Sequence, residues 1–108
     1  MLRTLDTHRQ FETLARSFLA EHPTIRHEWR HVRNAWGGRT DLICEPGSAN
    51  EVFASLTSWQ ITVGARGSNT DFEDFGRNLS DEQIAREAFG QFLKVLSESG
   101  IVSGGHDA

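Results

Sequence analysis

The hydrophobic period of the chain changes twice, and this constrains its fold more than any other feature. Near each end, apolar residues recur every three or four positions, as in a helix with one buried face. Between these regions apolar and polar residues alternate, as in half-buried strands. The pattern predicts one domain over residues 1–108, with a helix at each end and a sheet between them. We expect residues 1–5 and 103–108 to be frayed.

The first predicted helix covers residues 7–21. Thr7 and Gln10 match a capping box, and Pro23 ends the run because it disfavours helical angles in the residue before it. One predicted face carries the apolar residues Phe11, Leu14, Ala15, Phe18 and Leu19. This face is expected to pack on the sheet.

The second predicted helix covers residues 80–99. Ser80 and Gln83 repeat the capping pattern, two acidic residues follow in the first turn, and Gly100 is suited to end the helix. Its apolar face consists of Ile84, Ala85, Ala88, Phe92, Val95 and Leu96.

The middle of the chain predicts about four strands. Alternation over residues 52–56 and 59–63 indicates a hairpin, residues 40–45 form a third strand, and residues 24–33 fit a fourth strand, although a helix is also possible there. The expected fold is therefore α+β: an antiparallel sheet of about four strands, with the N-terminal and C-terminal helices packed on one face. The other sheet face would remain open as a docking surface.

The cysteine content and the hydropathy profile indicate a cytoplasmic protein. The single cysteine, Cys44, excludes an internal disulfide, fits a reducing compartment, and is expected to be buried in a strand. The sequence shows neither an apolar run of membrane-spanning length nor the apolar core of a secretory signal. We therefore expect no contact with a membrane.

The stretch HEWRH, from His27 to His31, matches the H-E-x-x-H pattern of zinc peptidases. On a helix, His27 and His31 would share a Zn²⁺, Glu28 would act as general base, and Glu51 would be a third ligand. Two nearby arginines oppose a dication. On a strand the histidines would lie about 13 Å apart, at a rise of about 3.3 Å per residue. We favour the strand, and a small zinc hydrolase remains an alternative.

The acidic segment DFEDFGRNLSDEQIARE, residues 71–87, holds six carboxylates and two arginines, and its net charge of -4 equals that of the whole chain. Such local charge mixed with aromatic residues fits a surface that meets a basic partner. It argues against direct binding of nucleic acid. The expected partner-binding residues are Trp36, Asp71, Phe72, Glu73, Asp74, Phe75, Asp81 and Glu82. Trp59 is a further candidate anchor, or a core residue. A solvated acidic loop or a cation site are the alternatives for this segment.

Residues 36–96 run from WGGRTDLICEPG through NEVFASLTSWQITVG to TDFEDFGRNLSDEQIAREAF. This region resembles a small bacterial immunity protein of the polymorphic toxin or contact-dependent growth inhibition type. The resemblance lies in the layout: a leading helix, short antiparallel strands, an aromatic and acidic loop, and a final capped helix. It includes no catalytic motif and transfers no individual binding residue.

The resemblance implies a cytoplasmic, non-enzymatic antidote without a cofactor. Such a protein binds and neutralises a cognate toxin domain, often a nuclease, whose basic active site would accept carboxylates in place of phosphates. A structural or regulatory α+β module is the main alternative. Such a module could form a homodimer through the open sheet face.

Overall fold

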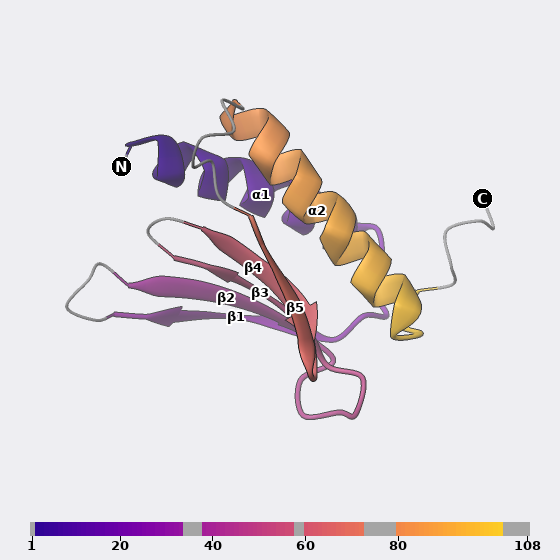
Figure 1. Cartoon of the computed structure of the whole chain (residues 1–108). Coiled ribbons are helices and arrows are strands. Elements are labelled where there is room, and N and C mark those ends of the chain that lie inside the picture. Colours follow the sequence, from indigo (N-terminus) through magenta and orange to yellow (C-terminus); the bar gives the residue numbers. More distant parts are fainter. Residues whose placement is uncertain (1, 34–37, 58–59, 73–79, 103–108) are drawn as a thin grey trace.

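The computed structural model describes residues 2–33, 38–57, 60–72 and 80–102. The chain forms helix α1 (Leu2–Ala20), strands β1 (His27–Val32), β2 (Arg39–Cys44), β3 (Val52–Leu56), β4 (Ile61–Ala65) and β5 (Ser68–Phe72), and helix α2 (Asp81–Glu98). Each strand pairs antiparallel with the next in the order β1-β2-β3-β4-β5, so β1 and β5 are the edges of the sheet that the described residues form. Both helices lie on one face of the sheet (Figure 1). The predicted α+β fold is confirmed, and the described part of the chain contains five strands in place of about four.

Strand β5 lies where the sequence analysis expected a loop. Its residues from Ser68 to Asp71 are all polar, so the apolar alternation that marks a strand is missing. The strand forms because β4 pairs with it, with Val63 opposite Thr70 and Ala65 opposite Ser68. Gly67, with φ of 83°, permits the tight turn between them.

Helix α1 begins at Leu2, earlier than predicted, so Thr7 is not its cap. Thr7 lies within the helix and is only 7% exposed. It is spaced four residues before Phe11 and eight before Ala15, which places it on the buried face. Residues 103–108 and Met1 lie outside the described residues, whereas residues 2–5, also expected to be frayed, belong to α1.

Helix α2 matches its prediction at both ends. Ser80 Oγ accepts a hydrogen bond from the Gln83 N–H at 3.1 Å, and Gln83 Oε1 accepts one from the Ser80 N–H at 2.9 Å. At the other end Gly100 has φ of 76°, and the Ile101 N–H donates to the Leu96 carbonyl at 2.9 Å. These are a capping box and a Schellman motif, so local chemistry sets both ends of this helix.

The core lies between the helices and one sheet face. All six predicted apolar residues of α2 are buried, and Phe11 of α1 meets Phe89 and Phe92 edge-on, with ring centroids 6.3 Å and 6.0 Å apart. Cys44 is fully buried, as predicted. Burial, together with the nearby Glu45, raises the pKa of its thiol to about 12. The thiol is therefore a packing group.

The register separates the two faces of the sheet. Leu42, Ala54 and Val63 face the helices and are fully buried. The residues one position along therefore point to the outer face. The register aligns there a polar row of Arg30, Asp41, Ser55, Thr62 and Asp71. Hydrogen bonds join some of these side chains, with Ser55 Oγ donating to Asp41 at 2.6 Å.

Candidate partner-binding site

The described residues of the acidic segment, 71–72 and 80–87, lie on two different elements, strand β5 and the start of helix α2. Asp71 and Phe72 are neighbours in β5 and therefore point to opposite sheet faces. Phe72 packs against the core, opposite Ile61 on β4. Asp71 is exposed on the outer face, where it accepts a hydrogen bond of 2.8 Å from Thr62 Oγ1.

Five other expected or candidate anchors lie outside the described residues, and their roles stay predictions. They are Trp36, Trp59, Glu73, Asp74 and Phe75.

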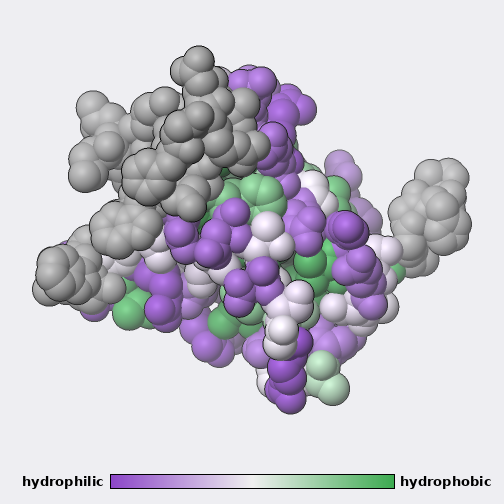
Figure 2. All heavy atoms as spheres, viewed as in Figure 1, coloured by the Kyte–Doolittle hydropathy of each residue, from purple (hydrophilic) through white to green (hydrophobic). Residues whose placement is uncertain are grey.

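Asp81 and Glu82 lie together in the first turn of α2, where the helix dipole favours negative charge. Asp81 Oδ1 accepts a hydrogen bond of 2.9 Å from Thr7 Oγ1 of α1. Glu82 forms an ion pair of 2.8 Å with Arg86, one turn further along α2. Figure 2 shows hydrophilic residues gathered around the start of α2.

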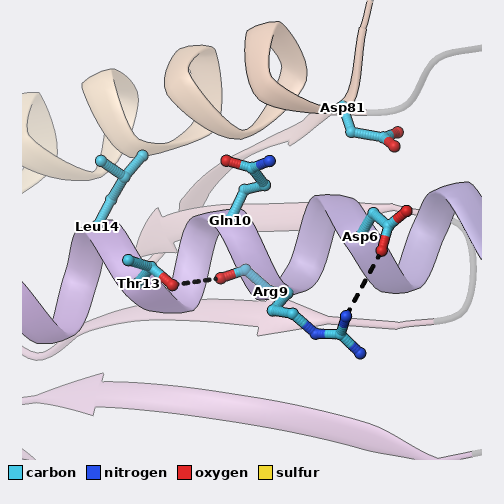
Figure 3. A pocket seen from close by; sticks show the side chains of 6 residues that line it. All are labelled: Asp6, Arg9, Gln10, Thr13, Leu14 and Asp81. Atoms are coloured by element: carbon cyan, nitrogen blue, oxygen red, sulfur yellow. Dashed lines mark hydrogen bonds and ion pairs between the residues drawn. The ribbon is translucent and has the colours of Figure 1, made fainter.

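An open hollow of about 480 Å³ lies between α1 and the start of α2. We call it the helix hollow, and Figure 3 shows the side chains that line it. Its lining residues are Asp6, Arg9, Gln10, Thr13, Leu14 and Asp81. Figure 1 shows that the two helices begin on the same side of the molecule, which is why carboxylates from both elements reach one rim.

The polar groups of the helix hollow differ in how firmly they are held. Asp6 and Arg9 form an ion pair of 3.7 Å in which the side chains are 57% and 77% exposed. Such exposed ion pairs contribute little to the stability of the folded protein, because water and salt screen them. Thr13 Oγ1 donates to the Arg9 carbonyl within its own helix at 2.9 Å. Asp6 and Arg9 are therefore the adaptable charges of the hollow, while Leu14 adds apolar surface to it.

Asp6 was not among the predicted site residues, because the predicted helix began at Thr7. A usable signal was present: Thr7 occupies the position four residues before Phe11 on the apolar face. A polar residue on a buried face requires a hydrogen-bond partner. That requirement indicates that another polar group approaches α1 at this point, and Asp81 is this group.

The HEWRH stretch forms strand β1, which confirms the strand interpretation over His27–Val32. His27 Nδ1 lies 3.5 Å from the Ile25 carbonyl, and His31 Nδ1 lies 3.1 Å from Thr40 Oγ1. Glu51 accepts a hydrogen bond from the Gly47 N–H. The one-sided helical arrangement that the zinc pattern requires is thus not formed. Among the described residues, no three His, Cys, Asp or Glu side chains are grouped so that they could hold a metal ion.

In comparisons with known proteins, no protein family, no curated protein and no solved structure matches this chain. Within the described residues, neither helix has the length and apolar character needed to cross a membrane.

Proposed function

We propose that this protein is a non-enzymatic immunity or inhibitor protein that captures a basic segment of a cognate toxin domain at the helix hollow. One observation carries the proposal: Asp6 of α1 and Asp81 of α2 line the same open hollow as the apolar side chain of Leu14. This combination suits a lysine or arginine side chain. The apolar stem can lie along Leu14 while the cationic head pairs with a carboxylate.

The chemistry of the expected partner also supports binding through carboxylates. A nuclease active site is basic because it holds phosphates, and an inhibitor that presents carboxylates can occupy or cover it. The remaining acidic residues of segment 71–87 would extend the negative surface and accelerate encounter at low salt.

The test is a binding titration against the protein encoded next to this one in its genome, at low and high salt. We expect one-to-one binding whose association slows at high salt, and loss of the neighbour's toxicity in the complex. No binding to that neighbour would contradict the proposed antidote function.

A charge reversal locates the contact. Asp6→Lys changes an exposed residue whose ion pair with Arg9 is long and solvent-exposed, so the fold should persist. We expect its association with the partner to slow by about tenfold, the scale of effects from electrostatic steering. Glu98→Lys is the matched control, because it makes the same charge change on an exposed residue at the far end of α2. Equal effects of the two substitutions would exclude the helix hollow as the binding site.

A further inference from the structure

Strand β1 is paired on one side only among the described strands, with β2. Its residues His27 to His31 read His-Glu-Trp-Arg-His, so the chemistry is nearly symmetrical about Trp29. Glu28 and Arg30 point to the outer face of the sheet, whereas Trp29 lies opposite Leu42 on the helix-covered face. An edge strand with unpaired backbone groups can accept another strand.

We infer that the occupant of this edge is a second copy of the same chain, joined antiparallel about a two-fold axis beside Trp29. In this arrangement Trp29 lies opposite Trp29 of the second copy. Glu28 lies opposite Arg30 of the second copy, and His27 opposite its His31. The two sheets become one continuous sheet of ten strands, with an isologous interface of the kind most homodimers use.

The charges select this register. Glu28 and Arg30 already form an ion pair within the strand. In the proposed dimer, two such pairs meet with opposite signs facing each other, which stabilises a cross-strand pair. A two-fold axis beside Glu28 would instead place two carboxylates face to face, and one beside Arg30 would place two guanidinium groups face to face. A shift of the strand pairing by a single residue would place side chains of the helix-covered face opposite side chains of the outer face.

The helix-covered face contributes an aromatic pair. Trp29 is partly buried against the core, and the Arg16 guanidinium of α1 lies 4.1 Å from the ring centroid. Arg16 is held in turn by Glu12 at 3.8 Å. Each tryptophan is therefore positioned before pairing, which lowers the entropy lost when two of them meet across the strands.

The opposite edge, β5, lacks these features. Its residues Ser68, Asn69 and Thr70 offer no apolar contact, and a two-fold axis beside Asp71 would oppose two carboxylates. The backbone of β5 also approaches β4 closely at Gly64: a Cβ on this residue would lie only 2.3 Å from the Ser68 carbonyl oxygen. Self-complementarity is therefore a property of β1 and not a general property of the sheet edges.

Sedimentation equilibrium of the free protein tests the inference, independently of any toxin. We expect the mass of the wild-type protein to rise with concentration to twice that of the chain. Glu28→Arg places only positive charges across the axis and should give monomer throughout the same concentration range. Glu28→Arg together with Arg30→Glu restores the opposition and should restore the dimer. A wild-type monomer at every concentration, or a dimer that survives Glu28→Arg, would overturn the inference.

Cysteine cross-linking tests the register. Trp29→Cys places two thiols opposite each other at a Cα separation of about 4.5–5.5 Å, within disulfide range. Val32→Cys is the matched control, because the two copies of residue 32 would lie about 20 Å apart, at about 3.3 Å per residue. The native Cys44 is buried and its pKa is raised to about 12, so it should not react. We expect covalent dimer from Trp29→Cys alone. Equal cross-linking of both variants, or of neither, would overturn the register.

Discussion

The hydroxyl of Thr7 donates a hydrogen bond of 2.9 Å to the carboxylate of Asp81, 74 positions further along the chain. Thr7 is buried within α1, and Asp81 is the first residue of α2. The bond therefore fixes where the second helix begins relative to the first. It also holds one rim of the helix hollow in place, since Asp81 lines that hollow.

Replacing Thr7 by Val keeps the shape of the side chain and removes this hydrogen bond. We expect a loss of about 1.5–3 kcal/mol in the free energy of unfolding, the usual worth of a hydrogen bond to a charged group. Urea unfolding at neutral pH measures it. The matched control is Thr13→Val, because Thr13 is exposed and donates within its own helix to the Arg9 carbonyl; it should change stability by about 0.5 kcal/mol or less. Similar losses in the two variants would show that the Thr7–Asp81 bond has no special weight.

Local signals explain which parts of the fold were predictable. The α2 boundaries follow from Ser80, Gln83 and Gly100, whose side-chain and backbone properties act within a few residues. The periods of three to four and of two likewise depend only on near neighbours in sequence, and they gave both helices and most strands.

The features that were missed depend on distant partners. Strand β5 consists mainly of polar residues, and it is a strand because β4 offers a pairing edge. The helix hollow combines Asp6 and Asp81, which come together only through the relative placement of two helices. The stretch from His27 to His31 is a different case: a helix was the alternative, the strand was favoured, and pairing with β2 confirms the strand.

Ser80→Ala tests the local origin of the α2 start. The substitution removes the oxygen that accepts from the Gln83 N–H at 3.1 Å. We expect the free energy of unfolding to fall by about 1 kcal/mol, the typical cost of a lost helix cap. The control is Ser17→Ala, at an exposed position inside α1, where alanine favours the helix and stability should be unchanged or slightly higher. A Ser80→Ala variant as stable as the wild type in urea would contradict the role of the cap.

His8 should make the protein less stable in mild acid. Burial lowers the pKa of His8 below its ordinary value of 6.5, partly opposed by a hydrogen bond with the Thr57 backbone. Its Nε2 is buried without a hydrogen-bond partner, so the neutral ring is favoured in the folded protein. The unfolded chain then binds the proton more readily. The contribution of His8 to stability is therefore full above pH 6.5 and falls as the pH drops through 6.5 toward the folded-state pKa.

Unfolding measured in urea between neutral and mildly acidic pH checks this dependence. His8→Leu should show a weaker loss of stability over the window just below pH 6.5 than the wild-type protein. If His8→Leu and the wild-type protein lose stability equally over this window, burial of the His8 ring does not control the response.

Two glycine substitutions should change stability in opposite directions. A Cβ on Gly64 of β4 would lie 2.3 Å from the Ser68 carbonyl oxygen and 2.6 Å from Asn69 Cβ, so Gly64→Ala must displace β5. We expect a loss of about 1–3 kcal/mol, as for other overpacked sites. Gly90 lies inside α2 with nothing within 4 Å of such a Cβ, and Gly90→Ala should stabilise by about 0.5–1 kcal/mol because alanine favours the helix. Urea unfolding of both variants decides the matter, and a stable Gly64→Ala protein would show that β5 is not held closely against β4.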